Sequence, residues 1–203
     1  RAVLGSVRKV HALERDYRET KFEHVLTNSK NYINEPKDDG YRGVHLIYRY
    51  MNTRVPAYNG LHLELQLRTK KQHAWATAVE TMGTFLGQAL KAGQGDQEWR
   101  DFFAKASAAL AIIEHTAPVP GFERCDRETV FHDVASTEAR LRVLQRLQGF
   151  AIAADKITAE RGQGAYHLIV LDSAKREVTI RPYAIASLEQ ARSEERRVGK
   201  GCR

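Results

Sequence analysis

The sequence predicts an α+β fold in which long helices flank a mixed, largely antiparallel sheet. Three observations predict it: short segments that alternate apolar and polar residues, longer segments with apolar residues three and four apart, and turn-rich connections between them. A helix comes first, strands follow, then long helices, and a strand pair closes the order. This order favours helices that pack around a mixed sheet.

The first part of the chain should contain one helix and several strands. Its opening residues, RAVL, resemble the end of a strand, and SVRKVHALERDYRE carries apolar residues at helical spacing behind Ser6, a candidate N-cap. Three further segments alternate apolar and polar residues, and two of them can pair as an antiparallel hairpin. These strand candidates are residues 22–33, 44–51 and 60–68.

Long helices should follow. Thr69, with Gln72 three places later, forms the reciprocal capping box that satisfies exposed amides at a helix start, and this helix is expected to run to Gly93. A second helix should begin at Asp96 and end before the PVPG segment. Trp75 of the first helix is expected in the core.

The C-terminal part should hold more helices and a closing hairpin. Residues 127–158 show helical spacing, in one helix or in two that separate at Gly149, and YHLIVLD with EVTIRPY predicts a hairpin. The helical segment's buried side is formed by Val130, Val134, Leu141, Leu144 and Leu147. The predicted organisation is a domain over 1–115, an extension over 116–192 and a tail over 193–203. The tail lacks apolar periodicity and resembles a vector or sequencing-adaptor scar, so it is expected outside the fold.

Composition limits the classes of partner. Lys and Arg outnumber Asp and Glu by 32 to 25, which gives a formal charge of +7 and favours anionic partners such as nucleotides or nucleic acid. No apolar run reaches the roughly 18–20 residues that a membrane span needs, so we expect a cytoplasmic protein with no membrane partner. The 2 cysteines are too few for a disulfide framework or a cysteine metal cluster.

Two strand candidates carry polar rows that could meet. One face of GLHLELQLRT is expected in the core and is formed by Leu61, Leu63, Leu65 and Leu67. The other face bears His62, Glu64, Gln66 and Arg68, which indicates either a solvated sheet face or the floor of an active site. On VHLIYRYM, His45 and Arg49 share one face and could join Glu64 and Arg68. Cations around one carboxylate suit a phosphate ligand, and the carboxylate could ligate Mg²⁺ or accept a proton.

The turn before these strands, PKDDGYRG, could complete a nucleotide site. Gly40 permits close backbone approach, Tyr41 offers a flat face on which a base can stack, and Lys37 and Arg42 offer charge for phosphates. By composition alone, a tyrosine after glycine is more often a core or rim aromatic residue than a stacking platform.

Two motifs resemble the synthetase domain of the RelA/SpoT family. PKDDGYRGVH resembles that family's guanosine-nucleotide loop, Pro-Lys-x-x-Gly-Tyr-Arg-Ser-x-His, and LELQLRT resembles its later strand, Glu-Ile-Gln-Ile-Arg-Thr. The HAWATAVE continuation is similar to single-domain alarmone synthetases and their toxin relatives. The resemblance covers roughly residues 1–115 and implies a nucleotidyltransferase-like synthetase fold.

This resemblance implies an enzyme that transfers pyrophosphate from ATP to the ribose 3′-hydroxyl of GDP or GTP and so makes (p)ppGpp. It implies that Tyr41 stacks on the acceptor guanine. It also implies that Glu64 is catalytic, either holding Mg²⁺ or drawing the proton from the 3′-hydroxyl. The other acceptor-binding residues that it implies are Lys37, Arg42, His45, Gln66, Arg68 and His73.

The sequence also departs from the family pattern. Gly43 stands where the family has serine, and the family's ATP-binding basic segment and Mg²⁺-binding aspartate would lie upstream of Arg1. We therefore expect a fragment that keeps the acceptor half of the site, lacks the donor half and is a poor or inactive synthetase by itself.

Other functions stay open from the sequence. A toxin-like pyrophosphotransferase could act on tRNA 3′ ends or adenosine nucleotides, and Arg140, Arg142 and Arg146 could serve an RNA or simply form a charged helix face. A catalytically silent module that binds nucleotides is a further alternative. Assembly as a homo-oligomer is compatible with all of these.

Overall fold

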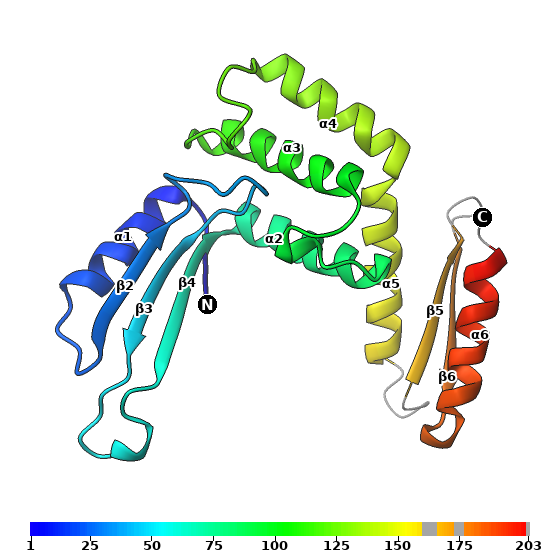
Figure 1. Ribbon diagram of the computed structural model, residues 1–203, viewed down its shortest axis with the longest axis horizontal. Helices are drawn as coiled ribbons and strands as arrows, with labels where there is room; N and C mark the ends of the chain where they lie inside the picture. The colour runs from blue at the N-terminus through cyan, green and yellow to red at the C-terminus, as the bar shows by residue number, and fades with distance from the viewer. Residues whose placement is uncertain (160–165, 173–176, 202–203) are drawn as a thin grey trace. The chain divides into compact units, whose positions relative to one another are not determined.

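The computed structural model describes residues 1–159, 166–172 and 177–201. These residues divide into two compact units, Arg1–Ala139 and Arg140–Arg203 (Figure 1). The domain boundaries expected at 115 and 192 stay predictions. No helix in the described ranges is both long enough and apolar enough to span a membrane.

The first unit is built on a four-stranded sheet with the order β1-β4-β3-β2. β1 runs parallel to β4, whereas β3 pairs antiparallel with both β2 and β4. The predicted mixed, largely antiparallel sheet is therefore confirmed. The strands are β1 (Ala2–Leu4), β2 (Val25–Asn31), β3 (Val44–Arg49) and β4 (His62–Thr69).

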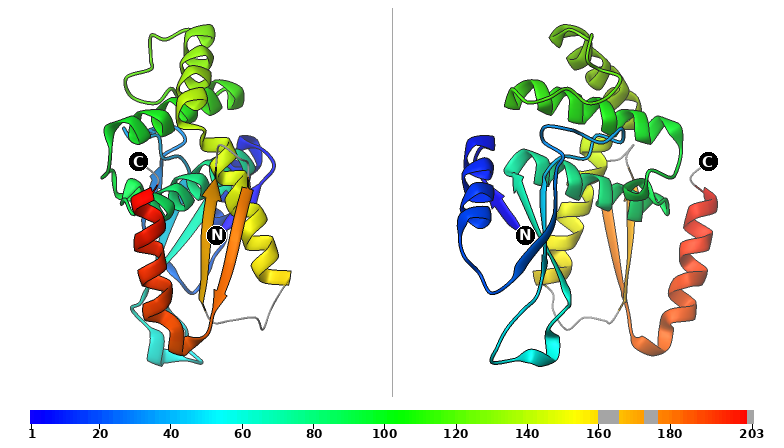
Figure 2. Two further views of the ribbon diagram at one scale, coloured as in Figure 1. Left: turned by 90° about the vertical axis from the view of Figure 1, so that its right-hand side faces the viewer. Right: turned by 60° about the vertical axis from the view of Figure 1, so that its left-hand side comes forward.

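Helix α1 (Val7–Glu19) packs against one face of this sheet (Figure 2). Ser6 caps it as predicted, because its hydroxyl accepts a hydrogen bond from the Lys9 amide at 3.3 Å.

The predicted core row of β4 is wrong at Leu61 and Leu63, which are 56% and 42% exposed. The hairpin after β3, which includes the 3₁₀ turn η1 (Pro56–Tyr58), extends past the end of α1 (Figure 1). The fully buried side chains here are Val10, Ile33, Val44, Leu46 and Leu67.

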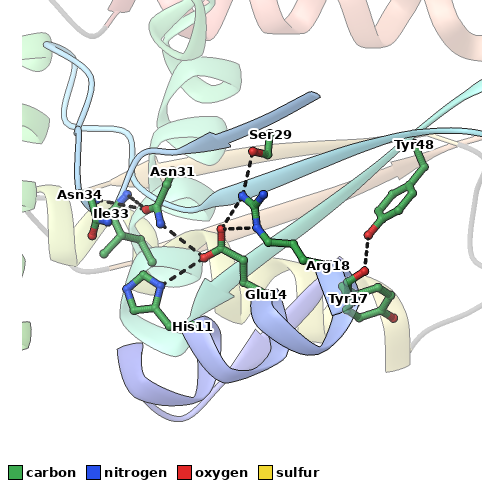
Figure 3. Close-up of polar contacts among 9 residues, drawn as sticks. All are labelled: His11, Glu14, Tyr17, Arg18, Ser29, Asn31, Ile33, Asn34 and Tyr48. Atoms are coloured by element: carbon green, nitrogen blue, oxygen red, sulfur yellow. Dashed lines mark hydrogen bonds and ion pairs between the residues drawn. The ribbon is translucent and has the colours of Figure 1, made fainter. Parts of the chain in front are cut away.

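A buried carboxylate ties α1 to β2 (Figure 3). Glu14 is 8% exposed and accepts from Arg18 at 2.8 Å and from the Asn31 amide at 3.4 Å. His11 lies 3.3 Å from the same carboxylate, and Arg18 also donates to the Ser29 hydroxyl at 2.8 Å. These contacts fix the helix on the strand that leads into the Tyr41 loop.

Replacing Glu14 with glutamine should lower the free energy of unfolding by about 1–3 kcal/mol, because one partner of a buried, charge-assisted network is lost. Glu19→Gln, an exposed change on the same helix, is the matched control and should stay within about 0.5 kcal/mol of wild type. Urea denaturation measures both. Equal stabilities of the two variants would show that the Glu14 contacts contribute nothing.

Helix α2 (Lys70–Leu86) starts where the sequence predicts it. The Thr69 hydroxyl accepts from the Gln72 amide and the Gln72 side chain accepts from the Thr69 amide, both at 3.1 Å, so the capping box is confirmed. Its predicted end is wrong: Gly87 adopts a left-handed φ of 64° and stops the helix, and Gly93 instead ends the 3₁₀ turn η2 (Leu90–Ala92).

Helix α3 (Gln97–Glu114) begins after Asp96 as predicted and packs beside α2 (Figure 1). Trp75 is core, as expected: its indole N–H donates to the Phe103 carbonyl at 2.8 Å.

Two predictions about the remaining helices are wrong. α4 (Arg127–Leu141) and α5 (Val143–Ala159) separate at Arg142, whose φ is 51°, and Gly149 lies inside α5. Leu144, predicted on the buried side, is 60% exposed.

In the second unit, β5 (Tyr166–Asp172) and β6 (Glu177–Tyr183) form the predicted antiparallel hairpin. Helix α6 (Leu188–Gly201) follows the turn η3 (Ile185–Ser187) and includes residues 193–201, for which the sequence predicted no element. The expected vector or adaptor origin of this tail stays a prediction.

Candidate active site

The sheet register brings the predicted polar rows together. His45 lies opposite Gln66, and Ile47 lies opposite Glu64, on the strand pair β3–β4. Val44 and Leu46, the chain neighbours of His45, are fully buried in the core on the other face of the sheet. The side chains of His45, Glu64 and Gln66 therefore share the face opposite that core.

A continuous chain of polar contacts crosses this face. An Arg68 guanidinium N–H donates to the Tyr41 hydroxyl oxygen at 2.6 Å, and the Tyr41 hydroxyl lies 2.5 Å from His45 Nε2. His45 Nδ1 contacts a Glu64 carboxylate oxygen. Gln66 accepts from Arg68 at 2.9 Å and donates to Glu64 at 3.2 Å. The network assigns the His45 proton to Nδ1, so that Nε2 accepts from tyrosine and Nδ1 donates to the carboxylate.

Burial sets the protonation of this network. The His45 side chain is 14% exposed, and burial lowers the pKa of His45 from 6.5 more than the Glu64 carboxylate raises it. Burial also raises the pKa of Tyr41 above 10.0, against the opposing effect of Arg68. At neutral pH the site therefore holds a neutral imidazole and a neutral phenol between a guanidinium and the Glu64 carboxyl group.

Acidification should destabilise the fold through His45. Because its pKa is lower in the folded chain than in the unfolded chain, the stabilisation is complete above about pH 6.5 and is lost as the pH falls through the lowered value. Urea denaturation between about pH 5 and pH 8 measures this, and the fall in unfolding free energy towards acid should be shallower for His45→Gln than for wild type. Parallel curves for the two proteins would contradict the assignment.

Aromatic rings and cations surround Tyr41. Tyr32 packs edge-on against Tyr41 and His45, with ring centroids 5.6 and 5.3 Å apart. The Lys37 ammonium lies 4.9 Å from the Tyr32 ring centre and 5.4 Å from that of Tyr41, and the Arg68 guanidinium lies 4.9 Å from the latter. The site thus offers aromatic surface and positive charge together, as nucleotide sites do.

Space next to Tyr41 lies between its loop, α2 and α3. A small pocket of about 40 Å³, bordered by Tyr41, Arg68 and Trp75, is large enough only for water. It adjoins a cleft of about 510 Å³, since both are bordered by Asp39, Gly93 and Arg100. Lys37 and Asp101 also line that cleft, whose volume is on the scale of a small-molecule site.

Glu64 is the carboxylate that a metal ion could use. Among the described residues, no three histidine, cysteine, aspartate or glutamate side chains gather into a metal site. The Glu64 side chain is 45% exposed, and one of its oxygens contacts His45. Mg²⁺ commonly needs only one or two carboxylates, with water and substrate phosphates as its other ligands. Glu64 therefore fits Mg²⁺ that is also held by a substrate's phosphates.

Comparison with known proteins identifies this part of the chain. Residues 2–83 match the family model described as "Region found in RelA / SpoT proteins". Residues 2–83, called the RelA/SpoT region from this point, are similar to that family. That region runs from β1 into α2 and includes the whole contact network from Lys37 to Arg68, whereas α3 lies outside it. No curated protein matches the chain.

Several solved structures are similar to this chain over part of their length. Small alarmone synthetase 1 from Bacillus subtilis, bound to its product pppGpp, is 21% identical, with a TM-score of 0.47 over 56% of this chain and 55% of that one. Small alarmone synthetase 2 from Bacillus subtilis is 18% identical, with a TM-score of 0.48 over 56% and 58%. A GTP pyrophosphokinase family protein from Streptococcus pneumoniae is 18% identical, with a TM-score of 0.45 over 56% and 53%. This chain thus spans little more than half the length of each.

Within the RelA/SpoT region, most of the predicted site residues meet. Two do not join them. Arg42 is 3% exposed and turns away, because its guanidinium donates to the Thr116 hydroxyl and to the Ala117 carbonyl. His73 is half-buried on α2, and its Nδ1 has no hydrogen-bond partner among the described residues. The residues that meet are Lys37, Tyr41, His45, Glu64, Gln66 and Arg68.

The residues around Glu64 differ from those that the sequence predicted. Arg49, expected beside Glu64, lies opposite His62, one pair further along the same face, and is exposed. Sequence reasoning missed Tyr32 and Lys30. Lys30 lies opposite His45 on β2, and both residues sit where that strand enters the PKDDGYRG turn. Their position in the sequence, shortly before the PKDDGYRG turn, could have indicated that they lie near the site.

Proposed function

We propose that the RelA/SpoT region of this chain binds a guanosine nucleotide as the acceptor of a pyrophosphate group from ATP. The observation that carries the proposal is the unbroken contact network from Arg68 through Tyr41 and His45 to Glu64. It joins an aromatic face suited to a base, cations suited to phosphates and one carboxylate suited to proton transfer.

In this proposal Tyr41 stacks on the guanine, and Lys37 and Arg68 neutralise acceptor phosphates. The ribose 3′-oxygen forms a bond to the β-phosphorus of ATP, the bond from that phosphorus to the α,β-bridging oxygen breaks, and AMP leaves. The 3′-hydroxyl proton passes to the Glu64 carboxylate, which His45 orients through its Nδ1–H. In the alternative role, Glu64 would hold Mg²⁺ together with the phosphates, and the ion would neutralise their charge. Positioning and charge neutralisation dominate phosphoryl-type transfers, which suits this inventory of side chains.

Labelled ATP tests the proposal. The full-length protein is incubated with ATP labelled at its β-phosphate and with GDP, GTP, AMP or deacylated tRNA, and binding of each acceptor to this chain is measured in parallel by calorimetry. We expect GDP and GTP to bind this chain and to be the acceptors that gain label in the full-length protein, whereas this chain by itself should transfer label poorly or not at all. Label that enters RNA alone would refute the small-molecule acceptor. Guanine-nucleotide binding without turnover in the full-length protein would favour a silent nucleotide-binding module.

A further inference from the structure

The loop that carries Tyr41 is held on both sides by α3 and the segment that follows it. The Gly40 carbonyl, just before Tyr41, accepts from the buried Ser107 hydroxyl at 2.6 Å. Arg42, just after Tyr41, donates to the Thr116 hydroxyl. The two chain neighbours of the central aromatic residue are therefore anchored to the same part of the fold.

The contact at Gly40 is too close for a side chain. Gly40 has a φ of 89°, and a Cβ atom placed there would lie 2.7 Å from Ser107 Cβ and 3.2 Å from the Trp75 ring. Real Cβ atoms do not approach carbon this closely, so the loop backbone packs directly on α3. The position of α3 thus fixes how far Tyr41 projects into the site.

The last residue of α3 holds the other side of the site. The two carboxylate oxygens of Glu114 accept from the Thr69 hydroxyl at 2.6 Å and from the side-chain amide of Gln72 at 2.9 Å. Thr69 and Gln72 are 1% and 2% exposed, and Thr69 directly follows Arg68. Glu114 therefore fixes the backbone at Thr69, the neighbour of Arg68, whose guanidinium contacts Tyr41.

Glu114 also compensates a buried charge. Burial lowers the pKa of Arg42, and the Glu114 carboxylate opposes this shift. Arg42 Nε and Nη1 have no hydrogen-bond partner within the part of the chain that the structure describes. Thr116, whose hydroxyl accepts from Arg42, lies two residues after Glu114, so the chain at the end of α3 holds the Arg42 side of the loop as well.

We propose that Glu114 is a positioning residue for the nucleotide site. Its hydrogen bonds to Thr69 and Gln72 fix the Arg68 end of β4 on the end of α3, while Thr116, two residues further along the chain, holds Arg42 of the Tyr41 loop. The two parts are thus fixed relative to one another, and the contact between Arg68 and Tyr41 is preserved. Glu114 lies outside the matched RelA/SpoT region, which ends at residue 83. The identity of the ligand, a guanosine nucleotide, rests on the proposed function; the positioning role itself rests on the contacts alone.

Hydrogen exchange measured by mass spectrometry tests the positioning role without a ligand. In the 203-residue chain, Glu114→Gln should speed amide exchange about tenfold in residues 40–44 and 69–72, because both anchors weaken. Peptides from α1 should keep wild-type rates, and Glu19→Gln on α1 should change neither segment. Unchanged exchange at 40–44 in Glu114→Gln would overturn the proposal, since the residue would then be a cap for α2 alone.

Nucleotide affinity separates positioning from simple stability. At a temperature where every variant is fully folded, Glu114→Gln should raise the Kd for GDP about tenfold. A Kd equal to wild type in folded Glu114→Gln would overturn the role.

The positioning role can still be tested if Glu114→Gln does not fold or if the wild-type chain binds no GDP. If Glu114→Gln does not fold, Thr116→Val removes the hydroxyl that accepts from Arg42 and donates to the Ala111 carbonyl within the same segment, and it should raise exchange at 40–44 but not at 69–72. A wild-type chain that binds no GDP would overturn the proposed function, while the exchange comparison would still decide the positioning role.

Discussion

Replacing Glu64 with glutamine is expected to lower the rate of pyrophosphate transfer by about a hundredfold or more, while the Kd for GDP stays within about threefold of wild type. Glutamine keeps the shape of the side chain, and its carbonyl oxygen can still accept from His45 Nδ1–H. It cannot take the 3′-hydroxyl proton and is a weaker ligand for Mg²⁺. Turnover is measured in the full-length protein with labelled ATP and GDP, and binding to this chain by calorimetry.

Glu19→Gln, an exposed change of the same type on α1, is the matched control for Glu64 and should leave both measurements unchanged. Gln66→Leu, which removes the neighbouring amide but keeps Glu64, should lower turnover less than Glu64→Gln does. Wild-type turnover in Glu64→Gln would contradict the catalytic role of this carboxylate.

Replacing Tyr41 with alanine should raise the Kd for GDP by about 10- to 100-fold, because stacking of a base on an aromatic side chain contributes about 1–3 kcal/mol. Tyr41→Phe keeps the ring and removes the hydroxyl that contacts Arg68 and His45. It should bind GDP almost as wild type does and lose turnover instead. Calorimetry and the labelled-ATP assay measure these two effects separately.

Tyr58→Ala is the control for this pair, since Tyr58 is 57% exposed on the β3–β4 hairpin, away from the described contact network. It should bind GDP as tightly as wild type. Equal losses in Tyr41→Ala and Tyr58→Ala would indicate that the ring of Tyr41 gives no specific stacking contact.

The parts of the fold and site that sequence predicted are those set by local spacing. The alternation in β4 places Glu64, Gln66 and Arg68 on one face whatever the rest of the fold does. The capping box needs only Thr69 and Gln72, three residues apart, so the start of α2 was predicted correctly.

The parts that sequence did not predict depend on contacts distant along the chain. Arg42 follows Tyr41 and carries the charge of a phosphate ligand, yet a hydroxyl 74 residues later decides which way it turns. Leu61 and Leu63 continue the apolar alternation of β4 but are exposed, and the β3–β4 hairpin extends past the end of α1 (Figure 1). Glu114 gave no signal in sequence because a polar residue at a helix end is usually solvated.

A crystal structure of this chain with GDP and Mg²⁺ would locate the acceptor nucleotide directly. We expect the guanine ring stacked on Tyr41 and the ribose 3′-oxygen within hydrogen-bond distance of the Glu64 carboxylate. GDP bound elsewhere on the molecule, or bound at Tyr41 with its ribose directed away from Glu64, would contradict this expectation.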